Sequence, residues 1–105
     1  MIKIEEFYQL EAWKKSYQLT ILIYKITKSF PKEERYSLID QLRRAASSVG
    51  ANIAEGFGRY HFADKVKFYY QARGSLKEVQ NFIFLARDLG YISTEKSEEI
   101  FKEIR

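Results

Sequence analysis

The regular spacing of apolar residues, at steps of three and four, is the feature that most constrains how this chain can fold. Such spacing places side chains on one face of an α-helix, which completes a turn every 3.6 residues. A helix beginning between residues 34 and 37 and ending near residue 56 is predicted in this way. Its inward positions are Leu38, Leu42, Ala45, Val49 and Ile53. No segment alternates with a convincing period of two, so the pattern predicts an all-α protein.

The same spacing predicts three further helices. Residues 10–30 form one helix that Pro31 ends, with a face of Leu10, Trp13, Tyr17, Thr20, Tyr24 and Thr27. Residues 62–89 form a longer helix, with a face of Phe62, Val66, Tyr69, Ala72, Leu76, Val79, Ile83 and Ala86. Gly90 suits the left-handed position that closes it, and Ser93 or Thr94 caps a short fourth helix with Ile100 and Ile104 inward. Short connections between four helices predict an antiparallel up-down four-helix bundle, with residues 1–105 as a single domain.

Small residues recur every fourth position in the second helix, at Ala46, Gly50, Ala54 and Gly58. A glycine in a helix interior costs about 1 kcal/mol relative to alanine. Gly50 therefore indicates a packing contact or a local bend, in preference to a merely tolerated glycine.

Several classes of protein are excluded or disfavoured by composition. The chain has no cysteine, so it has no disulfide, thiolate metal site or cysteine nucleophile, and this fits a cytoplasmic location. The longest apolar run, residues 82–86, is too short to span a membrane. A compact, soluble, cytoplasmic domain is expected.

Apolar residues occupy more than one flank of the first and third helices. Residues 21–24 and 82–85 each place four large apolar side chains in a row, and consecutive residues are turned by about 100°. Two helices with apolar material on opposite sides favour a second buried face against another subunit. Self-association with closed cyclic symmetry is therefore expected, since a contact that does not close would polymerise.

Catalysis finds little support in the residue types. His61, the single histidine, has no partner histidine for a metal and no serine at helical spacing. Gly56 and Gly58 lack the lysine and the preceding strand of a phosphate-binding loop. Glu55 and Glu78 are the only tempting carboxylate pair. The chain is predicted to be no enzyme, with no catalytic residues, metal or cofactor; a nuclease is a weak alternative.

Polar residues beside the apolar stripes of the second and third helices form a second pattern. Those singled out are Arg44, Asn52, Glu55, Arg73, Ser75 and Glu78. Charge close to a core must be paired, or it is costly. We favour a structural network in which Glu55 and Glu78 neutralise the arginines and thereby fix the register of the helices or a subunit interface. The alternative is that Arg44 and Arg73 face phosphates.

Positive charge is unevenly distributed over a chain with a net charge of +4. Residues 12–32 hold five lysines and no acid, residues 41–87 are net +5, and residues 88–105 are net −2. Such asymmetry is compatible with an acidic partner such as RNA or DNA. The solvated cations expected to contact phosphates are Lys14, Lys15, Lys25, Lys28, Arg43, Arg59, Lys65 and Lys67. A merely solvated face is the alternative.

Longer motifs resemble a known family. They are the segments 30–38 (FPKEERYSL), 41–46 (QLRRAA), 51–56 (ANIAEG) and 72–76 (ARGSL), followed by Gly90-Tyr91-Ile92. These segments are similar to the bacterial four-helix-bundle proteins encoded within intervening sequences of 23S rRNA genes. The polar residues singled out above also match signature positions of that family: Arg44, Asn52, Glu55, Arg73, Ser75 and Glu78.

The resemblance implies an antiparallel four-helix protomer. By analogy with the related accessory variability determinant of diversity-generating retroelements, it also implies a homopentamer whose basic surface binds nucleic acid and a reverse transcriptase. The leading hypothesis is a non-enzymatic oligomeric protein that binds RNA or DNA without strong sequence preference and has no membrane role. The rival is a protein-binding or scaffolding module, such as a reverse-transcriptase accessory protein, with no direct nucleic-acid role.

Overall fold

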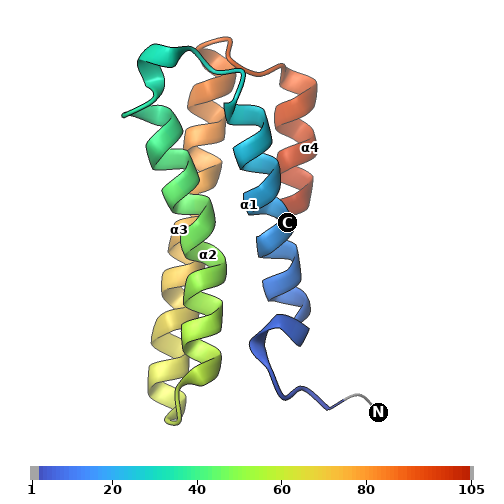
Figure 1. Ribbon diagram of the computed structural model, residues 1–105, viewed down its shortest axis with the longest axis vertical. Coiled ribbons are helices and arrows are strands. Elements are labelled where there is room, and N and C mark those ends of the chain that lie inside the picture. The colour runs from blue at the N-terminus through green and yellow to red at the C-terminus, as the bar shows by residue number, and fades with distance from the viewer. Residues whose placement is uncertain (1–2, 105) are drawn as a thin grey trace.

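The computed structural model describes residues 3–104. These residues form no strand and four α-helices: α1 (Glu11–Thr27), α2 (Leu38–Gly58), α3 (Phe62–Asp88) and α4 (Thr94–Ile104). Two short 3₁₀ helices, η1 (Phe7–Gln9) and η2 (Lys32–Glu34), precede α1 and α2. The chain runs up along α1, down along α2, up along α3 and down along α4 (Figure 1). The all-α prediction is confirmed.

The core is densest where all four helices meet. Ile23 of α1, Leu42 of α2, Ile83 of α3 and Ile100 of α4 are each fully buried. Burial of one such side chain stabilises the fold by about 1.5–3 kcal/mol. The predicted inward face of α2 is confirmed, since all of its members are buried except Ile53, which is half-buried.

The face of α1 that enters the core matches the predicted face only in part, at Thr27. Ser16, Leu19, Ile23 and Thr27 are buried, whereas Tyr17 is 54% exposed. The two buried hydroxyls are accommodated because they donate to carbonyls of their own helix, Thr27 Oγ1 to Ile23 O at 2.7 Å and Ser16 Oγ to Trp13 O at 2.7 Å.

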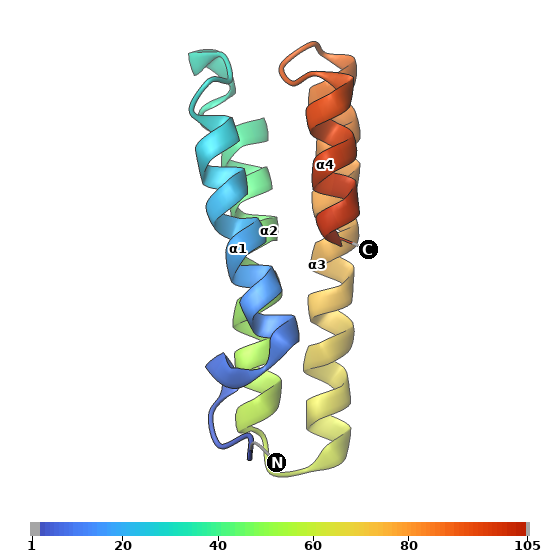
Figure 2. The same ribbon diagram turned by 90° about the vertical axis from the view of Figure 1, so that its right-hand side faces the viewer.

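The fourth helix covers only part of α3 (Figure 2). It has 11 residues and α3 has 27, so at 1.5 Å per residue it is about 24 Å shorter. The N-terminal part of α3 therefore lacks the cover that α4 gives the rest. Phe62 and Tyr69 are 80% and 40% exposed, which corrects the prediction that both face inward.

Two glycines explain local geometry. Gly90 has a φ of +80° and ends α3, as predicted. A Cβ on Gly50 would lie 3.0 Å from Ser16 Oγ and 3.4 Å from Trp13 Nε1, so the predicted packing contact is between α1 and α2. Ser93 caps α4, because its Oγ accepts a hydrogen bond from the Lys96 amide at 3.0 Å.

Candidate nucleic-acid interface

Three lysines, two in α1 and one at its C-cap, lie on the side of the helix opposite the core. At about 100° per residue, Lys14, Lys25 and Lys28 fall within an arc of about 60°, and Leu19 and Ile23 point the other way. All three lysines are exposed. They extend over about 21 Å of the helix, from the rise of 1.5 Å per residue. We call these three residues the α1 lysine line.

The α1 lysine line is largely unpaired. Lys14 Nζ lies 3.6 Å from Glu11 Oε1, an exposed ion pair of small energetic weight. Lys25 and Lys28 form no ion pair with any residue between 3 and 104, and the same holds for Lys15, which is exposed to one side of the line. These ammonium groups are free to meet phosphates.

A second group of predicted cations lies around the α2–α3 turn. The Arg59 guanidinium is 3.6 Å from Glu55 Oε2 and lies 4.7 Å from the centre of the Phe68 ring. Lys65 Nζ donates to the carbonyl oxygen of Phe57 at 2.8 Å, so it also satisfies the end of α2. Lys67 is exposed.

Arg43 was predicted to be a solvated cation, but the structure places its guanidinium against α1. Its Nε donates to Thr27 Oγ1 at 2.8 Å, and its Nη2 donates to the Tyr24 carbonyl at 3.3 Å. Its guanidinium also lies 4.6 Å from the centre of the Tyr24 ring. The half-buried Arg43 thus ties α2 to α1, and its hydrogen bonds are used within the protomer.

The charge pairing predicted for the polar stripe is not formed within the protomer. Arg44 Nε lies 3.0 Å from both carboxylate oxygens of Asp40, one turn earlier in α2. Glu55 pairs with Arg59 instead of Arg44. The neighbours one turn away compensate these exposed charges, so no contact across to another helix is needed.

Ser75 of the polar stripe connects α3 to α2 through Ser48, whereas Asn52 is bonded within α2. The hydroxyl groups of Ser48 and Ser75 are hydrogen-bonded to each other, and Asn52 Nδ2 donates to the Ser48 carbonyl at 2.8 Å. Arg73 and Glu78 are both exposed and form no ion pair with another described residue.

A groove of about 600 Å³ opens where α4 ends, between α1, α2 and α3. Its lining is mostly apolar, with Leu19, Val49 and Leu76 among its walls. Lys15 and Arg73 also line it. The sequence pattern did not predict this groove, because it follows from the length of α4.

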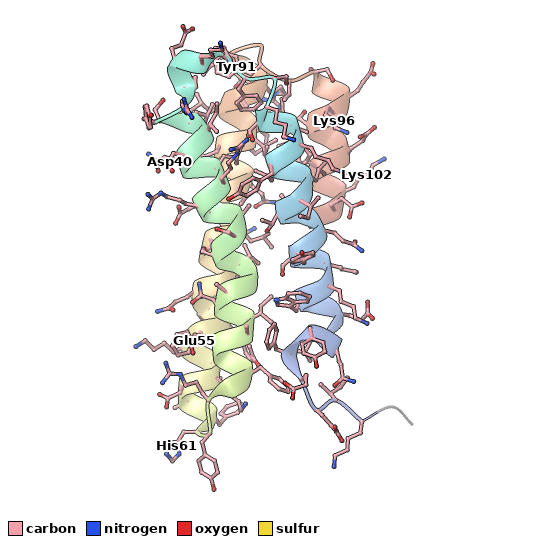
Figure 3. All side chains as sticks on the ribbon, in the orientation of Figure 1. Asp40, Glu55, His61, Tyr91, Lys96 and Lys102 are labelled. Atoms are coloured by element: carbon pink, nitrogen blue, oxygen red, sulfur yellow. The ribbon has the colours of Figure 1, made fainter. Side chains whose placement is uncertain are left out.

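Two rings are exposed at the α2–α3 turn, although the sequence predicted Phe62 inward and did not single out Tyr60. Tyr60 is 91% exposed and Phe62 is 80% exposed, both at the α2–α3 turn (Figure 3 labels His61 between them). The available signal was three consecutive ring side chains in a very short connection.

Between residues 3 and 104, no group of three or more His, Cys, Asp or Glu residues is placed to hold a metal ion. In the same range no helix combines the length and the apolar character needed to cross a bilayer.

Comparisons with known proteins agree with this architecture. The fold resembles a crystal structure of a protein of unknown function from the S23 ribosomal protein family of Bacteroides thetaiotaomicron VPI-5482. The two chains are 24% identical with a TM-score of 0.81, over 89% of this chain and 87% of the other. No curated protein matches the chain. The family model described as 23S rRNA-intervening sequence protein matches residues 8–105, and this chain therefore belongs to that family.

Proposed function

We propose that this protein is a non-enzymatic, oligomeric helical protein that binds RNA or DNA through its basic surfaces without strong sequence preference. The observation that carries the proposal is the α1 lysine line, which faces away from the core over about 21 Å. Each lysine that contacts a phosphate releases a condensed counterion, and this release favours binding regardless of base sequence.

Self-association is the second part of the proposal. Large apolar side chains remain partly exposed on α1 and α3, among them Ile21 at 42%, Phe84 at 47%, Leu85 at 44% and Leu89 at 50%. Burial of these side chains between copies of the chain in a closed ring would stabilise an oligomer. By analogy with the accessory variability determinant of diversity-generating retroelements, we propose a homopentamer in the cytoplasm, in which each protomer is an antiparallel four-helix bundle. Each subunit then repeats the α1 lysine line, so the phosphate contacts multiply.

A titration of fluorescently labelled 20-nucleotide RNA and duplex DNA at 50 and 200 mM salt tests the nucleic-acid proposal. We expect the triple variant K14E/K25E/K28E to bind at least tenfold more weakly than wild type at 50 mM salt. The control K32E/K77E/K102E changes the net charge equally at three other exposed lysines and should stay within about threefold of wild type. Absence of wild-type binding at 50 mM salt, or equal losses in both variants, would contradict the proposal.

The rival function is a protein-binding module, such as a reverse-transcriptase accessory protein. The apolar groove at the end of α4 favours it, since three helices with an open side are suited to receive a fourth. This rival predicts no binding of either nucleic-acid probe at low salt. A third possibility, a nuclease, predicts cleavage of the RNA probe in the presence of Mg²⁺ and is tested in the same samples by gel electrophoresis.

A further inference from the structure

The turn between α2 and α3 presents aromatic rings to solvent at one end of the molecule. Among the large apolar and aromatic side chains, Tyr60 is the most exposed, at 91%, and Phe62 is the third most exposed, at 80%. His61 lies between them at the extreme end (Figure 3). The rings of Tyr60 and His61 meet edge to face, with centroids 5.1 Å apart. Most of the Tyr60 and Phe62 side chains is open to a planar partner.

This exposure is costly for a folded chain. An aromatic side chain can bury 150–250 Å² and is among the strongest contributors to a core. Residues 3–104 cover only a fifth of Phe62, which is 80% exposed, and α4 ends far from the first turn of α3 (Figure 2). Exposed aromatic rings gathered at one place are typical of a surface that binds a partner.

The backbone that carries the rings is held firmly. The amide of Arg59 donates to the Gly56 carbonyl at 3.2 Å, and the amide of Lys65 donates to the His61 carbonyl at 3.1 Å. Just below the turn the helices are in close contact, since a Cβ on Gly56 would lie 2.7 Å from Tyr69 Cε1. A turn fixed in this way loses little conformational entropy when its rings meet a ligand.

The charges around the rings select the chemistry of that ligand. Arg59 lies in the turn, and Lys65 and Lys67 follow in the first two turns of α3, against the two acids Glu55 and Asp64. Glu55 is already paired with Arg59, whereas Lys67 forms no ion pair with any residue from 3 to 104. Open aromatic faces beside cations match single-stranded nucleic acid, whose bases stack on the rings and whose phosphates meet the cations. In a duplex the base faces are already stacked on one another.

We infer that the α2–α3 turn binds single-stranded nucleic acid by stacking unpaired bases on Tyr60 and Phe62, with Lys67 toward the adjoining phosphates. The inference rests on the proposed function and adds a preference to it. The α1 lysine line contacts any polyanion, while the turn distinguishes a single strand from a duplex.

The test compares a labelled 12-nucleotide single-stranded RNA with a duplex of the same sequence at 50 mM salt. We expect Y60A/F62A to bind the single strand at least tenfold more weakly, because each stacked base is lost with its ring. Duplex binding should be unchanged. Y36A is the matched control, since Tyr36 is 87% exposed in the connection at the opposite end of the molecule. Y60F/F62Y keeps both rings and should bind like wild type.

A second measurement follows the stack directly. In Y60W, single-strand binding should quench the emission of the new indole, whereas the emission of Trp13 in the wild type should not change. Trp13 is half-buried and stacks on Tyr17 with ring centroids 5.0 Å apart. The wild-type protein, which has Trp13 alone, therefore serves as the reference for Y60W.

The outcomes separate this inference from the function on which it rests. If Y60A/F62A binds the single strand like wild type while K14E/K25E/K28E does not, the stacking site is wrong and the nucleic-acid function stands. If Y36A lowers binding as much as Y60A/F62A, the turn has no special role and the inference is again overturned. If wild type binds neither probe, both proposals fall, and the exposed rings are left to a protein partner.

Discussion

The Tyr91 phenol donates a hydrogen bond to Glu34 Oε2 at 3.2 Å, joining two connections that are 57 residues apart in the chain. Tyr91 belongs to the connection between α3 and α4, and Glu34 belongs to η2, which precedes α2. The Tyr91 ring also packs against the buried Phe30, with centroids 5.4 Å apart. This contact closes the end of the molecule opposite the α2–α3 turn (Figure 3).

The Tyr91–Glu34 contact predicts a pH dependence. Burial raises the pKa of Tyr91 above 10.0, and the hydrogen bond to Glu34 and the negative charges of Glu34 and Glu33 raise this pKa further. The folded chain therefore holds the phenol proton more tightly than the unfolded chain. Its contribution to stability is complete below pH 10.0 and is lost as the pH rises through the folded-state pKa. In E34Q, NMR titration of the Tyr91 ring should give a lower pKa than in wild type.

The paired control for this titration is E99Q, at an exposed glutamate of α4 whose pairing is with Lys96. We expect it to leave the pKa of Tyr91 unchanged. An equal pKa in E34Q and wild type would show that the hydrogen bond is not formed in solution.

Two glycines in helices should respond in opposite ways to alanine. G56A should destabilise the fold, because the new Cβ would meet Tyr69 Cε1 at 2.7 Å. G74A should stabilise it by about 1 kcal/mol, because nothing lies within 4 Å of its Cβ and alanine is the better helix former. Urea denaturation of the two variants checks both signs, and a more stable G56A would show that α2 and α3 are farther apart than described.

The two neighbouring arginines of α2 should differ in their effect on stability. R43Q should lose about 1–3 kcal/mol of unfolding free energy, because it leaves Thr27 Oγ1 without its Nε donor and removes the cation over the Tyr24 ring. R44Q removes only an exposed pair with Asp40 and should change this free energy by about 0.5 kcal/mol or less. Thermal denaturation of the two variants side by side provides the measurement. Equal losses would contradict the assignment of Arg43 to the contact between α1 and α2.

Neutral substitution in the α1 lysine line should change the salt dependence of binding. For duplex DNA, log K falls with log salt concentration by about 0.9 for each phosphate contact. K25Q should therefore reduce the steepness of this line by about 0.9 for each copy of Lys25 in contact. K102Q on α4 serves as the comparison (Figure 3) and should keep the wild-type slope. A common slope for all three proteins would remove Lys25 from the interface.

The predictability of each helix from the sequence depended on how many apolar stripes it carries. The second helix has one strong stripe, so Leu42 and Val49 were correctly expected in the core. The first helix has apolar side chains on several flanks, and spacing alone favoured the flank of Tyr17. The core instead takes the flank of Leu19, where Ser16 and Thr27 satisfy their own hydroxyls and allow α2 to approach closely.

The candidate site could be predicted only as far as local pattern reaches. The exposed lysines followed from spacing along one helix. The role of Arg43 depends on Thr27 and Tyr24, which lie 16 and 19 residues away in the chain, and no pattern within α2 contains them. The exposure of Phe62 likewise depends on where α4 ends. The spacing within α3 holds no information on that end, and it predicted Phe62 to face inward.

Because α4 covers only part of α3, one half of the molecule consists of four packed helices and the other half of three. Local unfolding of the three-helix half disrupts fewer apolar contacts, so its amide protons should exchange with deuterium sooner than those around Ile83. The rings of the α2–α3 turn lie at this softer end. A bound single strand should slow this exchange in the helices around the rings, while the turn itself, already hydrogen-bonded to both helices, should change little.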